Sequence, residues 1–545
     1  MRKELIQLWL DSDNVSCIDK EKIKKMSEKE LETAFADKPL VFGTAGIRAK
    51  MGPGTQFLNK ITYYQMAMGY GKFLKSMFSK KTIKVIVAHD NRNNGVSFSL
   101  DVADVLTSLG IRVYLFENNQ LTSTPIVSYA IRKLKMHGAV VITASHNSGD
   151  DNGFKIYDET GCQFLPKDES KIVKLMPDVV DMINLEVNNN DRLITFLDED
   201  IFESYYLECQ SALINTNVNE TKKFPIIFSG QHGTACQRLP FFLKRLGYKN
   251  VISVRQQCVI DANFSYTPTP NPENINAWDL SLKYADKHKA RIIIQVDPDA
   301  DRFAVGLRHK EKWYFLNGNQ MGIIYTYYVL KNKKFSKIPY VVSSYVSTNL
   351  IDRILKSYNG KVYRTGTGFK WIGSKINKID DKEELVVAFE EAIGALNSTI
   401  NRDKDAYQAA ALTLEIYKEC LDRKMDLIDL LEKEVYAKYG VVYNDTIQFI
   451  FDGLNWKNMV QQRLDKVLKF DKEIIGNRKI NKIQYNKNGG CFDWLLEGGS
   501  WIRFRASGTE PKFKIYYNLY GESIIQLKSE SIQITAELKK MLDLN

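Results

Sequence analysis

Several features that would restrict the class of this protein are missing from its sequence. No run of apolar residues approaches the roughly 18 needed for a membrane-spanning helix, and the charged start Met1-Arg-Lys-Glu-Leu is not followed by an apolar signal core. The seven cysteines show no CxxC spacing, and their odd number argues against a disulfide framework. We therefore expect a cytoplasmic protein with reduced thiols and no membrane segment.

The sequence also lacks a basic tail, a recognised nucleic-acid motif and any block of about five like charges. Its net charge of +11 comes from 76 Lys and Arg against 65 Asp and Glu, spread along the chain. Such a dispersed excess indicates a solvated, lysine-rich surface that can steer phosphorylated metabolites. We expect no nucleic-acid partner.

Apolar strands and amphipathic helices alternate along most of the chain. At 545 residues, 44% of them hydrophobic, the sequence is long enough for three or four domains. Three α/β segments follow a charged helical start, and the tail is α+β, with shorter strands and a final helix near 523–542. This order predicts a triplicated unit with an appended domain. We place the four domains at 1–198, 199–312, 313–434 and 435–545.

The strongest local patterns predict individual elements. Helices are predicted near 62–79, 96–109, 167–184, 200–214, 319–331 and 405–422. Strands are predicted at 83–88, 112–116, 224–228, 251–254, 291–296, 340–344, 384–388, 501–505 and 514–517.

An apolar, β-branched run from Ala139 ends at Thr143-Ala144-Ser145-His146-Asn147. Such a pattern predicts a buried strand that delivers Ser145 to a loop at its carboxyl end, where open α/β sheets bind ligands. Lys155 follows the turn dipeptide Asn152-Gly153, which would fold a second limb of the loop back beside the serine. Ser145, His146 and Lys155 are therefore candidate catalytic residues, and the alternative is a polar turn between strands.

The position of His146 distinguishes two kinds of chemistry. In an acyl-transfer enzyme this histidine would be the base for Ser145. Adjacent residues on extended backbone point to opposite faces, so we expect His146 to orient the loop instead.

Polar clusters also follow two neighbouring elements of the first segment. Arg48 comes after the glycine turn at 43–46 and offers a fork of donors to an anion. His89-Asp90-Asn91-Arg92 follows the predicted strand at 83–88. This second cluster is either part of a site or a helix-capping Asp with a surface Arg.

Asp297, Asp299 and Asp301 follow the predicted strand at 291–296 directly. On extended backbone these alternate residues point to one face, and clustered carboxylates repel one another unless a cation bridges them. Oxygen ligands suit Mg²⁺, so the pattern favours a magnesium site over a solvated acidic turn. An EF-hand is excluded, because Arg302 and Arg308 stand where that loop needs glycine and glutamate.

Two further loops have the composition of a phosphate site and a sugar site. The stretch Arg505-Ala-Ser507-Gly508-Thr509-Glu-Pro-Lys512 offers an arginine fork, two hydroxyls, a flexible glycine and a lysine. Glu390 and Glu391 follow a predicted strand and can accept hydrogen bonds from sugar hydroxyls, or they can form a charged helix start.

Four of these loops together resemble one family. Thr143–Asn147, Asp297–Arg302, Glu390–Gly394 and Arg505–Thr509 occur in the order and at about the spacing that characterise the α-D-phosphohexomutases, and the likeness spans nearly the whole chain. Residues 42–54 and 389–394 look most like the long subgroup of phosphoglucomutase-2-type and phosphopentomutase enzymes.

The resemblance implies four domains around a central cleft, three related α/β domains and a smaller α+β domain. It implies that Ser145 is the phosphoserine and that Mg²⁺ binds its phosphate together with Asp297, Asp299 and Asp301. By the same resemblance, Lys155 is the general acid/base, and Arg48 and Arg302 flank the phosphoryl group. The implied sugar-binding residues are Glu390, Glu391, Gly368 and Lys370, and the implied phosphate-binding residues are Arg505, Ser507, Gly508, Thr509 and Lys512.

The implied activity is that of an isomerase, a phosphoglucomutase or phosphomannomutase acting on a phosphorylated sugar, with a sugar 1,6-bisphosphate as activator and intermediate. The alternatives are a phosphopentomutase, an aspartate-nucleophile phosphatase with Asp297 as nucleophile, and an inactive sugar-phosphate-binding protein. Ala392 and Gly394 stand where many hexomutases have serine and histidine, so the identity of the sugar stays open. We expect a monomer or homodimer.

Overall fold

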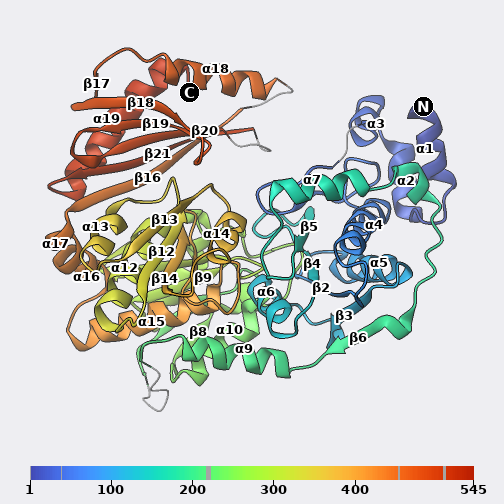
Figure 1. Cartoon of the computed structure of the whole chain (residues 1–545), viewed down its shortest axis with the longest axis horizontal. Helices are drawn as coiled ribbons and strands as arrows, with labels where there is room; N and C mark the ends of the chain where they lie inside the picture. Colours follow the sequence, from blue (N-terminus) through green and yellow to red (C-terminus); the bar gives the residue numbers. More distant parts are fainter. Residues whose placement is uncertain (1, 38–39, 216–221, 452–454, 507–510, 545) are drawn as a thin grey trace. The chain divides into compact units, whose positions relative to one another are not determined.

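The computed structural model describes residues 2–37, 40–215, 222–451, 455–506 and 511–544. The chain forms two compact units. The first comprises Met1–Arg308, Trp313–Phe315 and Ser398–Ala411, and the second comprises His309–Lys312, Leu316–Asn397 and Leu412–Asn545. Each unit is built around two β-sheets (Figure 1), and these four sheets confirm the predicted four-domain α/β architecture.

The first sheet of unit 1 has the strand order β1-β5-β4-β2-β3-β6. Its strands are β1 (Ile47–Lys50), β2 (Lys84–His89), β3 (Arg112–Phe116), β4 (Gly138–Ile142), β5 (Asp151–Tyr157) and β6 (Ile194–Leu197). β4, β2, β3 and β6 run parallel, whereas β5 at one edge is antiparallel to both of its neighbours, β4 and β1. Every residue of β4 is buried, which explains its unbroken apolar sequence. His89 pairs with Ile142, so the loops after β2 and β4 leave the sheet side by side.

Eight helices of the described chain belong to this domain. They are α1 (Arg2–Asp11), α2 (Cys17–Lys25), α3 (Glu28–Ala34), α4 (Lys60–Met77), α5 (Gly95–Ser108), α6 (Thr124–Lys133), α7 (Pro166–Leu175) and α8 (Val179–Ile183). The single helix predicted near 167–184 is wrong, because the structure has two. Pro177 separates them: it has no N–H to donate, and Met176 before it is extended.

The second sheet of unit 1 has the order β11-β10-β9-β7-β8. Its strands are β7 (Ile226–Ser229), β8 (Val251–Ser253), β9 (Ile292–Val296), β10 (Phe303–His309) and β11 (Lys312–Leu316), and its helices are α9 (Asp200–Ser211), α10 (Ala235–Arg245) and α11 (Asp279–His288). β9 and β10 form an antiparallel pair in which Val296 lies opposite Phe303. Residues 297–302 are therefore the turn of a hairpin.

Unit 2 begins with a sheet of order β13-β12-β14-β15. Its strands are β12 (Ile338–Ser344), β13 (Lys361–Thr365), β14 (Glu383–Glu390) and β15 (Gly394–Leu396). The helices are α12 (Gly318–Asn332), α13 (Leu350–Lys356), α14 (Phe369–Ile376), α15 (Ala406–Asp422), α16 (Leu427–Leu430) and α17 (Ala437–Tyr439), and the start of α15, up to Ala411, belongs to unit 1.

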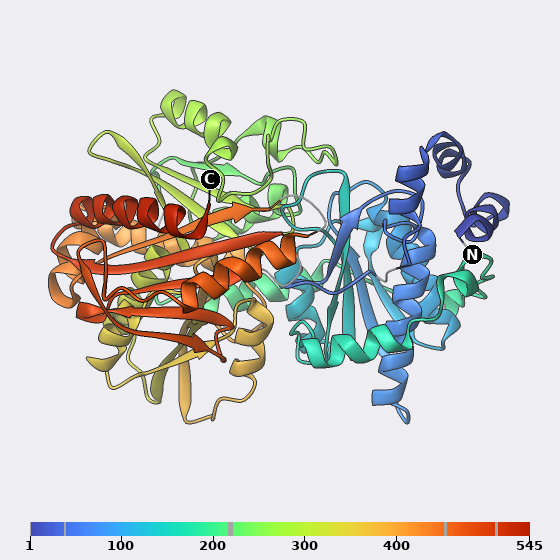
Figure 2. The same cartoon turned by 90° about the horizontal axis from the view of Figure 1, so that it is seen from above.

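The last sheet is antiparallel throughout and has the order β16-β21-β20-β19-β18-β17, with the short β17 paired to β18 at one edge. Its strands are β16 (Val441–Ile450), β17 (Ile474–Ile475), β18 (Arg478–Asn486), β19 (Cys491–Leu496), β20 (Trp501–Ala506) and β21 (Lys512–Gly521). The helices α18 (Trp456–Leu468) and α19 (Ile524–Leu542) lie along it and share its apolar core (Figure 2). The predicted α+β character of the tail is confirmed.

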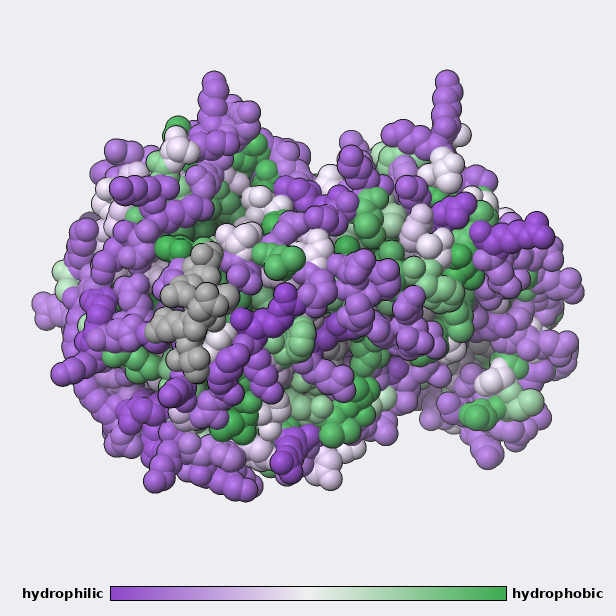
Figure 3. All heavy atoms as spheres, turned by 90° about the horizontal axis from the view of Figure 1, so that it is seen from below, coloured by the Kyte–Doolittle hydropathy of each residue, from purple (hydrophilic) through white to green (hydrophobic). Residues whose placement is uncertain are grey.

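On the face seen in Figure 3, hydrophilic side chains predominate and apolar ones are scattered between them. No helix in the part of the chain that the structure describes is long and apolar enough to cross a membrane.

Candidate functional site

Three buried carboxylates lie together in the turn between β9 and β10. One oxygen each from Asp297, Asp299 and Asp301 lies within 4.8 Å of the other two. The expectation of extended backbone is wrong here, because the segment is a turn in which Ala300 has a φ of 54°. The turn, rather than strand alternation, gathers the carboxylates.

The chemistry of this cluster fits a divalent cation. Asp299 Oδ1 and Asp301 Oδ1 are buried and have no hydrogen-bond partner among the residues that the structure describes. Burial, and then the charges of Asp299 and Asp301, raise the pKa of Asp297 well above its ordinary value. Buried carboxylates of like charge with free oxygens are the ligand set that Mg²⁺ prefers.

Ser145 follows β4 and faces this cluster. Its Oγ donates a 2.7 Å hydrogen bond to Asp297 Oδ2, and its side chain is buried. The backbone at Ser145 is left-handed, with a φ of 55°, a conformation that few residues other than glycine adopt. The Ser145 N–H donates to Thr143 Oγ1 at 2.9 Å, which helps to hold this turn.

His146 is also closer to the reacting oxygen than extended backbone would allow. Its Nδ1 lies 3.2 Å from Ser145 Oγ, so the expectation that the two side chains diverge is wrong. Burial, followed by the charges of Arg302 and Arg48, lowers the pKa of His146 well below its ordinary value. The imidazole is therefore neutral near pH 7.

Lys155 lies in the middle of β5 and reaches the carboxylates from the first sheet. Its Nζ is 2.5 Å from Asp299 Oδ2 and 3.1 Å from Asp301 Oδ2, and all three side chains are buried. The predicted turn at Asn152-Gly153 is wrong, since both residues belong to β5. A Cβ at Gly153 would collide with the carbonyl oxygens of Thr143 and Ile47, so close packing explains this glycine.

The charges around Lys155 favour its protonated form. Burial and the cations Arg48 and Lys404 lower its pKa, but Asp299 and Asp301 outweigh them, and the pKa of Lys155 is raised. Without a cation among the carboxylates, Lys155 is a charged ion-pair partner rather than a base.

The sequence did not reveal Lys404 as part of this cluster. Its Nζ lies 3.0 Å from Asp301 Oδ2 and 3.4 Å from Asp403 Oδ1. Tyr157 donates to the other oxygen of Asp403 at 2.8 Å. The only signal was a charged run at 402–405 before an apolar helix, which reads equally well as a helix start.

Arg48 and Arg302 both lie near the serine loop. Arg48, in β1, donates to Asn147 Oδ1 at 3.3 Å, and burial lowers its pKa. The Arg302 backbone N–H donates to Asp297 Oδ1 at 2.9 Å, and its guanidinium donates to Glu273 at 2.8 Å. Both arginines depress the pKa of His146, which places their charge near the serine.

A second group of expected site residues lies in unit 2. Glu390 ends β14, and its Oε1 accepts a 2.6 Å hydrogen bond from the backbone N–H of Gly368. Glu391 accepts a 2.8 Å hydrogen bond from Ser344 Oγ. The alternative of a charged helix start is wrong, because β14 turns back into β15. Lys370, in the first turn of α14, is buried in the same region.

The expected phosphate loop connects β20 to β21. Arg505 lies near the end of β20 and Lys512 begins β21. Burial, and then the charge of Glu391, raise the pKa of Tyr516, whereas the nearby Arg505 lowers it. An expected phosphate-binding residue, Arg505, and an expected sugar-binding residue, Glu391, therefore both lie near Tyr516 in unit 2. The remaining expected residues, Ser507, Gly508 and Thr509, lie outside the described residues.

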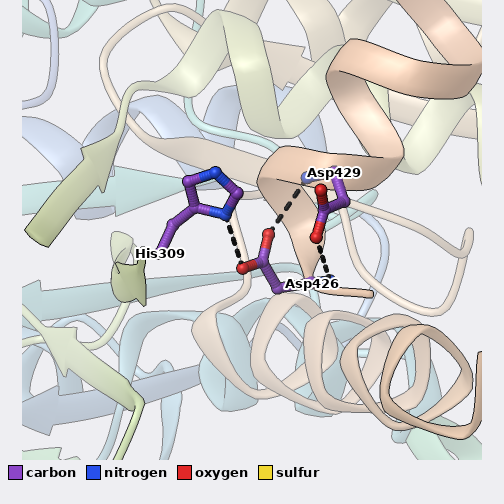
Figure 4. A group of neighbouring side chains, drawn as sticks. All are labelled: His309, Asp426 and Asp429. Atoms are coloured by element: carbon purple, nitrogen blue, oxygen red, sulfur yellow. Dashed lines mark hydrogen bonds and ion pairs between the residues drawn. The ribbon is translucent and has the colours of Figure 1, made fainter. Parts of the chain in front are cut away.

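One other cluster in the described chain has the composition of a metal site (Figure 4). Its ligand atoms are already in use. Asp426 Oδ2 lies 2.8 Å from His309 Nδ1, and Asp426 Oδ1 accepts from the backbone N–H groups of Ile428 and Asp429. Asp429 is bound in turn by Lys433 and by the Asp426 N–H. This cluster is a capping box at the start of α16.

Comparison with known proteins extends the likeness over the whole chain. Residues 39–179, 204–310 and 317–438 match, in order, the phosphoglucomutase/phosphomannomutase alpha/beta/alpha domains I, II and III. The phosphomannomutase of Mycoplasmoides pirum is 64% identical over 544 residues, covering 100% of both chains. The phosphoglucomutase of Staphylococcus saprophyticus is 30% identical, covering 96% of this chain and 98% of its own.

Solved structures show the same fold. Parafusin, a phosphoglucomutase from Paramecium, superposes with a TM-score of 0.70 at 19% identity, covering 93% of this chain and 95% of its own. The three domain matches and the full-length relatives show that this chain belongs to the phosphoglucomutase/phosphomannomutase family of α-D-phosphohexomutases.

Proposed function

We propose that this protein is a phosphotransferring isomerase that interconverts a hexose 1-phosphate and the corresponding 6-phosphate, with Ser145 as the phosphoryl carrier. The observation that carries the proposal is the 2.7 Å contact between Ser145 Oγ and Asp297, inside a buried cluster that also holds Lys155. Such a site combines a hydroxyl that can carry a phosphoryl group, a cation site and a proton carrier.

The proposed reaction has two transfers. Phosphorylated Ser145 gives its phosphoryl group to the free hydroxyl of a sugar monophosphate, which forms a sugar 1,6-bisphosphate. The bisphosphate turns over, and its other phosphate returns to Ser145 as the product hydroxyl is released. Lys155 takes the proton of the attacking sugar hydroxyl and returns a proton in the second step.

The carboxylates connect this chemistry to Mg²⁺. Bound by Asp297, Asp299 and Asp301, the ion would neutralise charge on the transferring phosphoryl group. Its charge would also offset the two carboxylates that raise the pKa of Lys155. Lys155 would then be left with burial and the neighbouring cations, which lower its pKa and suit it to act as a base.

The residues of unit 2 are assigned to substrate recognition. Glu390 and Glu391 would accept hydrogen bonds from sugar hydroxyls, and Gly368 and Lys370 would complete that group. Arg505 and Lys512, with Ser507, Gly508 and Thr509, would bind the phosphate that is not reacting.

Mannose phosphate is the preferred substrate in this proposal, because the relative at 64% identity is named a phosphomannomutase. Glucose phosphate is the second candidate, since the relative at 30% identity is named a phosphoglucomutase. The phosphopentomutase alternative draws no support from these relatives.

The two remaining alternatives fit the site less well. An aspartate nucleophile needs a free oxygen, but Asp297 Oδ1 accepts the Arg302 N–H and Oδ2 accepts the Ser145 hydroxyl. A sugar-phosphate-binding protein without activity has no need of a buried serine, lysine and carboxylate cluster in mutual contact.

Coupled assays on mannose 1-phosphate, glucose 1-phosphate and ribose 1-phosphate, with Mg²⁺ and a hexose 1,6-bisphosphate, test the proposal. We expect turnover of the two hexose phosphates, with the higher kcat/KM for mannose 1-phosphate. Release of inorganic phosphate without an isomerised product would support the phosphatase. Binding of the hexose phosphates without turnover would support the inactive binding protein.

A further inference from the structure

The side chain of Arg92 is completely buried against the serine loop, so the alternative of a surface arginine is wrong. Its guanidinium donates to four backbone carbonyl oxygens of this loop. The distances are 2.8 Å to Ser145, 2.7 Å to Asn147, 2.5 Å to Ser148 and 2.8 Å to Asp151. One side chain therefore binds nearly the whole turn that connects β4 to β5.

Asp90 fixes the direction of this guanidinium. Asp90 Oδ2 accepts from Arg92 Nε at 3.2 Å, and Oδ1 accepts from the Arg92 backbone N–H at 3.0 Å. The ring of Phe264, from the second domain, lies 5.2 Å from the guanidinium carbon. Asp90 Oδ2 also accepts a 2.6 Å hydrogen bond from Thr143 Oγ1, whose oxygen accepts the Ser145 N–H. The contacts form a closed circuit that begins and ends at Ser145.

This circuit of hydrogen bonds needs the number and arrangement of donors that an arginine side chain has. The planar guanidinium has five N–H donors in a fixed fork, whereas a lysine ammonium has three at a single point. Four carbonyls and a carboxylate therefore cannot all be satisfied by lysine. The loop they belong to includes the left-handed Ser145, whose conformation needs the surrounding contacts to persist.

We propose that Arg92, seated on Asp90, is a positioning residue that sets the direction in which Ser145 Oγ presents its phosphoryl group. Arg92 acts through the loop backbone, and Asp90 acts through Arg92 and Thr143. This inference rests on the proposed function of Ser145, and it extends that function to two residues outside the phosphohexomutase loops.

Two variants each break a different part of this circuit of hydrogen bonds. Arg92→Lys keeps the charge beside Asp90 but loses the fork, and Asp90→Asn keeps the shape but loses the ionic partner of Arg92. Arg238→Lys is the matched control. Arg238 also pairs with a carboxylate, Glu199 at 3.0 Å, and lies over an aromatic ring, Phe202 at 3.5 Å. In the described part of the chain its hydrogen bonds go to Glu199 and Gln120 and not to residues 143–151.

Hydrogen exchange of the purified full chain tests positioning without reference to catalysis. We expect Arg92→Lys and Asp90→Asn to speed amide exchange in the peptide that covers 143–151, while Arg238→Lys leaves that peptide unchanged. Unchanged exchange at 143–151 in both variants, with the folded state intact, would overturn the proposal.

Steady-state kinetics then separate positioning from stability. A displaced phosphoryl group lowers kcat, and a shift of about 1 Å costs about 100-fold. We expect a loss of about that size in Arg92→Lys, with KM changed by less than about 3-fold because Arg92 is placed to bind the loop rather than the substrate. Equal losses of kcat in Arg238→Lys at matched melting temperature would indicate a merely structural role and overturn it.

The double variant gives the last comparison. If Asp90 and Arg92 position Ser145 through the same set of contacts, the loss of kcat in the double variant is no larger than in the worse single variant. Losses that multiply would contradict a shared role. A wild type without mutase activity would refute the proposed function, whereas an active wild type with unaffected variants would refute this inference alone.

Discussion

At the scale of single residues, the site is defined by charges that cannot coexist without partners. Asp297, Asp299 and Asp301 are buried together, and Lys155 and Lys404 are their nearest cations. Burial by itself would raise the pKa of Asp301, but Lys155, Lys404 and Arg302 lower it below its ordinary value. The cluster therefore has the negative charge that a divalent ion needs, and binding of the ion would change the pKa of Lys155.

Removing the carboxylates should remove the metal. We expect Asp299→Asn to weaken Mn²⁺ binding, measured by electron paramagnetic resonance, at least about 10-fold, because a neutral amide is a poorer ligand for a hard cation. EDTA should abolish turnover of the wild type, and added Mg²⁺ should restore it.

Asp429→Asn is the control for this experiment, because it removes an aspartate from the capping-box cluster of α16. Mn²⁺ binding that falls equally in Asp429→Asn, or that is unchanged in Asp299→Asn, would contradict the assignment.

Lys155 and Lys404 contact the same carboxylate but should differ in function. Arginine keeps the positive charge but does not lose its proton in proteins. We therefore expect Lys155→Arg to lower kcat about 10²- to 10⁴-fold, the usual contribution of general acid–base catalysis. Lys404→Arg should stay within about 10-fold of the wild type, and similar kcat losses in the two variants would count against Lys155 as the proton carrier.

At the scale of elements, helix α5 contains an aspartate, Asp101, whose charged form is destabilised by burial. Burial raises the pKa of Asp101 to about 6, and the nearby Lys60 offsets this only in part. The folded-state pKa then lies above the unfolded value near 3.8. Because the folded state binds the proton more tightly, the contribution of Asp101 to stability falls as pH rises from about 4 to about 6, and it stays lower above that range.

Asp101→Asn should therefore stabilise the protein at pH 8. We expect a gain of about 1 to 3 kcal/mol in the free energy of unfolding, since one pKa unit corresponds to about 1.4 kcal/mol. Urea unfolding at pH 8 and at pH 4 measures it, and the gain should shrink at pH 4. Asp471→Asn, at an exposed aspartate far along the chain from α5, controls for the loss of one charge. A gain that is the same at both pH values would contradict the pKa shift of Asp101.

The elements themselves were largely predictable, because burial determines apolar patterning. The strand at 112–116 and the helix at 405–422 are present within a residue of the predicted bounds. The turns were not predictable from the sequence, because their geometry depends on contacts with residues elsewhere in the chain. Gly153 was read as a turn residue, but it lies in β5 because two carbonyl oxygens leave no room for a side chain.

The same distinction applies to the site. Ser145, Lys155 and the three aspartates stood out because several reactive groups followed apolar strands. Lys404 did not stand out, and the sequence left Arg92 undecided between a site role and the surface, because the contacts of both residues are long-range. The left-handed backbone at Ser145 was equally hidden, and it explains why His146 approaches the serine oxygen.

At the scale of the whole molecule, four sheets in two units match a family in which three α/β domains precede a fourth. The four-domain architecture was predictable because the motifs are spread along the chain in a fixed order. The identity of the sugar was not predictable, because Ala392 and Gly394 stand where many hexomutases have serine and histidine. Our proposal of mannose phosphate therefore rests on the 64% identity to a relative named a phosphomannomutase.

The most direct test of the central claim is the phosphorylation of Ser145. The protein is incubated with glucose 1,6-bisphosphate and Mg²⁺, and the peptide that spans residues 139–157 is analysed by mass spectrometry. We expect one phosphoryl group on Ser145 in the wild type and in Ser148→Ala, and none in Ser145→Ala, which should also lack mutase activity. A phosphoryl group on another residue, or a Ser145→Ala variant that keeps most of its activity, would contradict the account.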